Sequence, residues 1–159
     1  MKPKTTVMTV VASVVLLGAA ALSVSTGAQA TPPSVPGPAA SQLVLGTLDG
    51  PSKAKKDHIE LKVGSDTTVR TFTLTYPPGS SSGWHAHPGI VLAVVESGSV
   101  TRQFADCSAP QTFTAGQAFT EVPGHLVTNP GATDAVLRIT QLFPAGTTVL
   151  REDLPDPGC

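Results

Sequence analysis

From about residue 43 onward, short apolar or alternating segments recur along the chain, separated by Gly, Pro and Ser. This spacing is typical of all-β proteins built from many short strands, and no helix longer than a turn or two is indicated. The expected strands cover residues 43–48, 58–63, 68–76, 83–87, 90–96, 99–104, 117–121, 125–129, 134–143 and 147–151. The pattern therefore predicts an all-β domain.

Two of these segments show how the sheets should be covered. In the first, Phe72, Leu74 and Tyr76 alternate with threonines, which indicates a strand with one buried face. The second, residues 90–95, is apolar throughout, so we expect both of its faces to be covered. Gly98 follows it and predicts a tight hairpin into the next strand.

The first thirty residues have the features of a signal peptide. Two lysines precede an apolar run from residue 7 to about residue 22, and Ala28-Gln29-Ala30 ends the segment with small residues. We expect cleavage after Ala30 and a secreted or extracytoplasmic protein. An uncleaved membrane anchor is the alternative, because the run approaches spanning length, although polar and small residues interrupt it. After cleavage no stable membrane association is expected.

The remainder is long enough for one domain with one core. We expect a flexible leader at 31–42, a β-barrel at 43–153 and a C-terminal tail at 154–159. Loss of the two leader lysines takes the formal charge from −1 to −3, which favours neither nucleic acid nor an anionic membrane as a partner. The only basic cluster, around Lys55, is typical of a solvated loop.

Cys107 and Cys159 are the two cysteines of the chain. Export would place them in an oxidising compartment, so we predict a disulfide between them that tethers the Pro-rich tail. The alternative is a pair of free thiols that act as metal ligands or nucleophiles. It has little support, because neither cysteine has a histidine or a second cysteine near it in sequence.

Three of the four histidines are spaced as a metal site requires. His85 and His87 are separated by one residue, so in a strand they point to the same face and can reach one ion. His125, from a distant strand, would complete the set. Glu121 and Gln103 are candidates for a general base or a substitute ligand, and the alternative for each is a solvent-facing strand residue.

The same residues resemble the two motifs of the cupin family. The first motif matches at Gly79, His85, His87 and Gly98, and the second at Gly116, Gly124, His125 and Asn129. The resemblance covers roughly residues 70–145. It implies a small double-stranded β-helix, or jelly-roll barrel, with His85, His87 and His125 as metal ligands. Pairing through edge strands in the resembling proteins makes a homodimer an expectation by analogy.

Two departures from the family pattern bear on the site. Val91 stands where the family usually has a glutamate ligand, and two residues are missing between the glycine and the histidine of the second motif. The expectation is an ion held by neutral imidazoles alone, with two or three coordination positions open. The shortened turn also leaves open whether His125 reaches the other two histidines.

These features predict an exported cupin that binds a divalent ion (Fe, Mn, Ni, Cu or Zn) and a small-molecule ligand or substrate. The leading hypothesis is a dioxygenase-like, oxygen-dependent oxidoreductase. The alternative is a non-catalytic small-ligand-binding or scaffold cupin, which the missing glutamate favours. A third hypothesis is an isomerase or lyase that uses the ion as a Lewis acid without oxygen.

Overall fold

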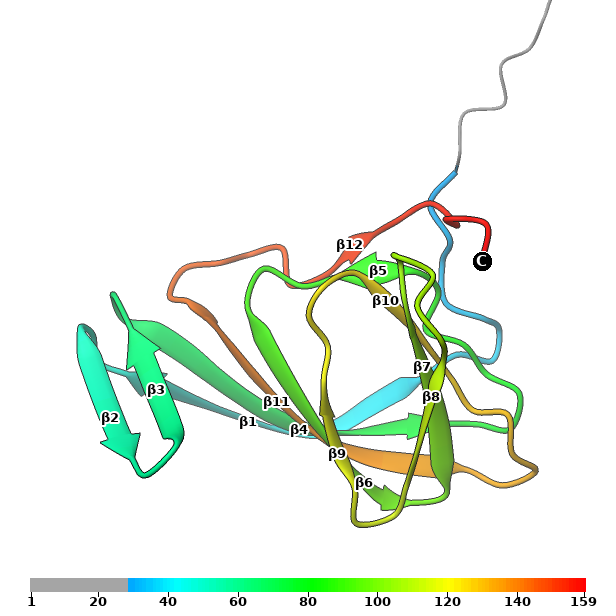
Figure 1. Ribbon diagram of the computed structural model, residues 1–159, viewed down its shortest axis with the longest axis horizontal. Helices are drawn as coiled ribbons and strands as arrows, with labels where there is room; N and C mark the ends of the chain where they lie inside the picture. The colour runs from blue at the N-terminus through cyan, green and yellow to red at the C-terminus, as the bar shows by residue number, and fades with distance from the viewer. Residues whose placement is uncertain (1–28) are drawn as a thin grey trace, which may run out of the picture.

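The computed structural model describes residues 29–159, and almost all of the expected signal peptide lies outside this range. All regular secondary structure in the described part is β (Figure 1). The strands are β1 Ala39–Leu48, β2 Ser52–Lys56, β3 Ile59–Val63, β4 Thr67–Tyr76, β5 His85–Ala86, β6 Ile90–Ser97, β7 Ser99–Phe104, β8 Gln111–Thr114, β9 Ala118–Thr120, β10 His125–Thr128, β11 Ala135–Pro144 and β12 Glu152–Asp153. Residues 29–159 contain no helix with the length and apolar character to cross a membrane.

Two five-stranded antiparallel sheets form the barrel. One has the order β1-β4-β11-β6-β9 and the other β12-β5-β10-β7-β8. The longest pairing joins β4 and β11 from Ala135↔Tyr76 to Pro144↔Thr67. Gly98, at φ 72°, forms a tight turn from β6 into β7, but the two strands lie in different sheets and do not pair, so the predicted hairpin was wrong. A Cβ atom on Gly98 would lie 2.7 Å from the Asp134 carbonyl oxygen, so this turn requires glycine.

The core lies between the sheets and is built by strict alternation. Every second residue of β11 from Ala135 to Phe143 is buried. The buried apolar cluster comprises Phe72, Tyr76, Val91, Ala93, Val95, Val100, Phe119, Val127, Ala135, Leu137 and Ile139. The all-β, two-sheet architecture expected from the sequence is therefore confirmed.

The prediction that both faces of residues 90–95 are covered was wrong. In β6, Val91, Ala93 and Val95 are buried, whereas Ile90 and Leu92 on the outer face are 57% and 42% exposed. An apolar run does not distinguish a strand covered on both faces from one with an open apolar face.

Three further strand predictions need correction. Residues 147–151 form no strand, and the C-terminal segment pairs with β5 only further on, at β12. Strands β2 and β8 were not expected. The lysines of β2 gave the signal of a loop, because this strand pairs only with β3 and carries no buried apolar face.

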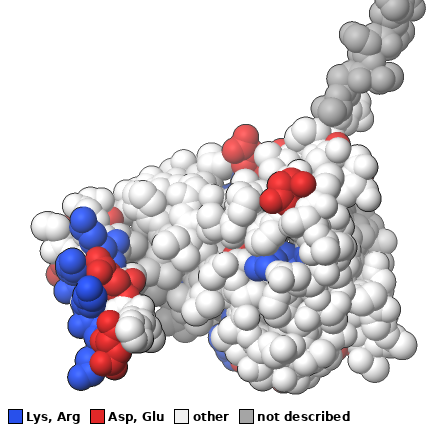
Figure 2. Space-filling view, in the orientation of Figure 1, with Lys and Arg blue, Asp and Glu red and all other residues white. Residues whose placement is uncertain are grey.

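The β2–β3 hairpin stands away from the barrel (Figure 1). It carries Lys53, Lys55, Lys56 and Lys62, which are all the lysines of the described residues. Figure 2 shows charged side chains of both signs gathered over this hairpin, while the rest of the visible face is mostly uncharged. His58 lies in its turn and is exposed, as the sequence suggested.

The segment expected to be a flexible leader, residues 31–42, is instead part of the fold. Its last four residues belong to β1, which begins at Ala39. The Thr31 amide donates to the Leu154 carbonyl at 2.9 Å, and Ser34 bonds to Ser81 through backbone and side chain. Thr31 packs so closely that its carbonyl would lie 2.1 Å from a Cβ atom on Gly83.

The C-terminal tail runs beside this segment and ends in a disulfide. Cys107, in the loop after β7, is bonded to Cys159 with an S–S distance of 2.03 Å. Both described ends of the chain therefore lie at the same end of the barrel (Figure 1).

Candidate metal centre

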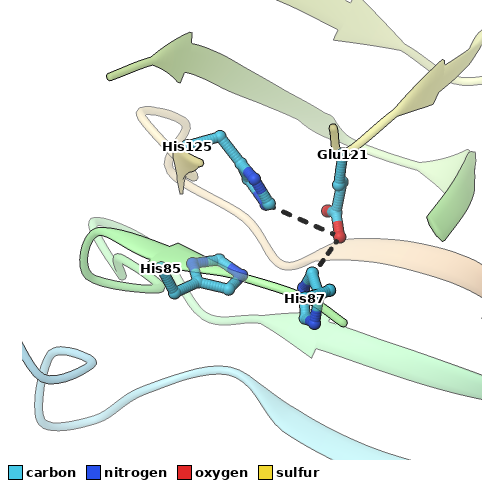
Figure 3. A group of neighbouring side chains, drawn as sticks. All are labelled: His85, His87, Glu121 and His125. Carbon is cyan, nitrogen blue, oxygen red and sulfur yellow. Dashed lines mark ion pairs between the residues drawn. The ribbon is translucent and has the colours of Figure 1, made fainter. Parts of the chain in front are cut away.

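Three histidines and one glutamate converge inside the barrel (Figure 3). His85 begins β5 and His125 begins β10, and these two residues are direct partners across the sheet. His87 follows β5 on the same face as His85, as the single-residue spacing requires. Glu121 follows β9 on the opposite sheet. The ligand atoms of the four side chains all lie within 4.8 Å of one another.

The shortened second motif does not displace His125. Its ring centroid lies 4.3 Å from that of His85 and 5.7 Å from that of His87. The motif's Asn129 holds the far end of β10, because its side-chain amide donates to the Tyr76 and Thr133 carbonyls at 2.8 Å. The strand therefore enters in register, and the structure brings the three sequence-predicted histidines together.

Each imidazole is oriented by a backbone carbonyl. Nδ1 lies 2.9 Å from the Gly83 oxygen in His85, 2.8 Å from the Leu150 oxygen in His87 and 3.0 Å from the Pro123 oxygen in His125. A carbonyl can only accept, so each Nδ1 must carry the hydrogen. In the neutral ring, Nε2 then presents its lone pair to the centre, as a metal ligand must.

Glu121 supplies the carboxylate that Val91 cannot. Its amide donates to the Val91 carbonyl at 3.1 Å, so Glu121 lies beside Val91 on the neighbouring strand. One carboxylate oxygen lies 3.5 Å from His87 Nε2 and 3.6 Å from His125 Nε2 (Figure 3). The solvent-facing alternative for Glu121 is therefore wrong, and so is the expectation of imidazole donors alone. Its position directly before the shortened turn was the available signal.

Electrostatics keep two of the four groups in their ligand forms at neutral pH. Burial, then the neighbouring His125 and Arg151, lowers the pKa of His85 to about 3, so this ring is neutral. For Glu121, burial alone would raise the pKa. The imidazoles of His125 and His87 that face the carboxylate outweigh burial and lower the pKa to about 2, so the carboxylate is ionised.

The group fits a metal ion because two of its acceptor atoms are buried and have no hydrogen-bond donor. Nε2 of His87 and of His125 are buried and have no hydrogen-bond partner. Their separations from the Glu121 oxygen exceed a hydrogen bond but suit two ligands of one ion at about 2.0–2.2 Å from each. Buried polar atoms without a partner are costly, and a shared cation would satisfy all of them.

Comparisons with known proteins give similar structures but no sequence match. No protein-family model matches the chain, and no curated protein does. Among similar solved structures, a cupin 2 conserved barrel domain protein from Salinispora arenicola is 23% identical, with 48% of this chain and 64% of that chain covered and a TM-score of 0.43. A cupin-like protein from Thermotoga maritima is 16% identical, with 57% and 77% covered and a TM-score of 0.45.

A recombinant oxalate oxidase in complex with glycolate is 20% identical, with 46% of this chain covered and a TM-score of 0.42. The match spans only 41% of the oxalate oxidase chain. In the present structure, the histidines of both sequence motifs lie close together inside a two-sheet β-barrel. A two-sheet β-barrel is the fold that the resemblance to cupins implies.

Gln103, the second candidate from the sequence, lies away from the candidate metal centre. In β7, Val100 and Arg102 are buried between the sheets, so Gln103 faces the other side of its sheet. The prediction that Gln103 could face the cavity was wrong, because the side chains of the even-numbered residues of β7 point into the barrel. Arg102 takes the inward position beneath Phe104, with its guanidinium carbon 4.1 Å from the ring centroid.

A cavity of about 270 Å³ opens beside the four ligands. His85, His87 and Glu121 line one part of it. Apolar side chains of β4 and β11 form much of the remaining wall, and residues from both chain ends contribute to it. The barrel thus combines a candidate metal centre with room for a small molecule.

Proposed function

We propose that this cupin holds one divalent transition-metal ion and acts on a small molecule at that ion as an exported, oxygen-dependent oxidoreductase. The observation that carries the proposal is the convergence of three oriented imidazoles and a carboxylate, with two buried Nε2 atoms left without partners. Imidazole with carboxylate suits Fe, Mn, Ni, Cu and Zn. When bound, the ion would supply Lewis-acid or redox chemistry to a ligand in the adjoining cavity.

The residues of the chain have separate parts in this function. His85, His87, Glu121 and His125 would hold the ion, and one carboxylate would reduce its +2 charge to a net +1. Four protein ligands leave two positions of an octahedral ion for oxygen, water or substrate. Export is supported by the leader sequence and by a disulfide, which persists in oxidising compartments.

Elemental analysis of natively exported protein tests the metal part of the proposal. We expect about one equivalent of a transition metal per chain, and loss of that metal in the double variant His85→Ala/His87→Ala. The exposed His58→Ala variant is the matched control and should retain the metal. A wild-type protein that remains metal-free after reconstitution would contradict the proposal.

Oxygen uptake tests the redox part. The metal-loaded protein should consume oxygen with at least one member of a panel of diketones, phenols, thiols and organic acids. Ligand-induced thermal stabilisation without oxygen uptake would instead indicate a non-catalytic binding module, and turnover without oxygen a Lewis-acid isomerase or lyase.

A further inference from the structure

Arg70 is a cation without an acidic partner on the wall of the cavity. It lies on β4 and lines the cavity together with Phe72 and Gln141. No ion pair joins Arg70 to any acid within residues 29–159. Its Nε is buried and has no hydrogen-bond partner, while Nη1 reaches the Gln141 side-chain oxygen only at 3.5 Å. The guanidinium therefore has unused donors beside an open space.

The other arginines of the described part are already engaged. Arg138 pairs with Glu96 at 2.9 Å on the outer face, and Arg151 pairs with Asp153 at 2.6 Å. Arg102 is enclosed by phenylalanine rings and donates to the Thr120 carbonyl. Arg70 thus differs from them in combining a cavity position with an uncompensated charge.

The register of the sheet places Arg70 in line with the metal centre. Arg70 pairs with Gln141 on β11, and Gln141 pairs with Val91 on β6. Glu121 bonds to Val91 from the next strand. One row across the sheet therefore carries a cation at one end and the metal-ligating carboxylate at the other, about three strand spacings or 14 Å of backbone apart. Both ends line the same cavity.

The wall beside Arg70 is apolar. Phe72, Leu74 and Ile139 line the cavity on neighbouring strands, and the Arg70 guanidinium carbon lies 4.7 Å from the Phe72 ring centroid. Stacking on an aromatic ring holds a guanidinium flat and leaves its edge free for a bidentate carboxylate. The cavity therefore offers an anion anchor, an apolar middle and a metal centre.

We propose that Arg70 is a specificity-determining residue that anchors the carboxylate of a small organic acid. The acid has an apolar middle and a second oxygen-bearing end directed to the metal centre. The second contact rests on the proposed function, whereas the anchor at Arg70 does not. Small α,ω-dicarboxylates have this chemistry and serve as probes.

Calorimetric titration with the dicarboxylates from malonate to suberate tests the anchor. Metal-loaded wild-type protein should bind at least one length, and the neutral diamide of that length should not bind. Arg70→Met, which keeps the apolar stem, should weaken binding at least about tenfold, because a charge-assisted bidentate contact is lost. Arg70→Lys should recover part of this loss, and the outer-face control Arg138→Met should bind like wild type.

Metal content measured on the same samples separates this inference from the proposed function. Arg70→Met should keep the wild-type metal content. In metal-free protein, hexanoate should bind more weakly than the dicarboxylate does to loaded protein, but still depend on Arg70. A wild-type protein that takes up no metal on reconstitution, but binds hexanoate in an Arg70-dependent way, would overturn the metal proposal alone.

Equal dicarboxylate binding by wild type and a folded Arg70→Met protein would overturn the anchor alone. So would binding of the neutral diamide as tightly as the diacid, or no binding of any probe. The diamide comparison uses only wild-type protein, so it decides the matter even where the variant does not fold.

Discussion

At the scale of single residues, Val91 and Glu121 determine which donors the candidate metal centre has. Val91 stands at the glutamate position of the motif, and Glu121 provides the carboxylate instead. The two residues are neighbours on adjacent strands, joined by a backbone hydrogen bond of 3.1 Å. A carboxylate that enters from β9 therefore reaches nearly the same space as one that would enter from β6. The donor set keeps three imidazoles and one carboxylate, although the sequence motif lacks its glutamate.

This interpretation predicts that Glu121 is needed for tight metal binding. Glu121→Gln preserves shape but removes the charge, so affinity for Zn²⁺ should fall at least about tenfold in competition titrations. The double variant Val91→Glu/Glu121→Val should recover part of the lost affinity, because it returns the carboxylate to the neighbouring strand. If Glu121→Gln binds Zn²⁺ as wild type does, Glu121 is not a ligand.

His85 gives a second residue-scale prediction, for the stability of the metal-free protein. Its pKa is about 3 in the folded chain, against 6.5 for an unperturbed histidine. The unfolded chain therefore takes up a proton first, and stability falls as the pH drops from about 6.5 towards 3. The contribution is about 5 kcal/mol when integrated over this range.

Chemical denaturation between pH 8 and pH 3.5 measures this dependence. His85→Gln does not titrate there, so its stability should fall less steeply with acid than that of wild type. His58→Gln changes an exposed ring and should retain the wild-type slope. Equal slopes for wild type and His85→Gln would contradict the burial argument.

At the scale of elements, alternation predicted those strands whose buried face is apolar. Strands β4, β7 and β11 follow from this signal, because their inward residues meet the core. Strand β2 could not be predicted in this way, because it is rich in lysine and pairs only with β3, with no buried apolar face. The pattern also did not show which residues of β7 face the barrel interior, and Gln103 lies on the outer side.

The same distinction applies to the site, where residues close in sequence could be placed and residues brought together by strand order could not. The His85 and His87 pair could be placed from the period of two of an extended segment. Glu121 could not, because its position depends on strand order, with β9 beside β6, and on a turn that is two residues shorter than the family motif. Contacts between strands distant in sequence carry no local signature, and Arg70 in the same row was missed for this reason.

At the scale of the whole molecule, the two ends of the chain complete the site. Pro33, from the N-terminal segment, lines the cavity with Leu150 and Arg151 from the segment before β12. The Leu150 carbonyl accepts from His87 Nδ1, so the C-terminal segment also orients a candidate ligand. The Cys107–Cys159 disulfide tethers this segment, which links the stability of the fold to the geometry of the metal centre.

The disulfide carries the last prediction. In the chain-entropy model, closing a loop between cysteines 52 residues apart stabilises the fold by about 4 kcal/mol. The double variant Cys107→Ser/Cys159→Ser should therefore unfold roughly 10 °C below wild type, with weaker Zn²⁺ binding because the support behind His87 loosens. Reduced wild-type protein should behave like the variant, which controls for the serine hydroxyls.

Mass spectrometry of the unreduced, natively exported protein provides the direct check. Alkylation should label neither cysteine before reduction and both afterwards. Two labelled thiols in the unreduced protein would show that the bond does not form. The C-terminal segment would then depend on the short β12 pairing and the Leu154–Trp84 hydrogen bond of 2.8 Å to keep its place behind His87.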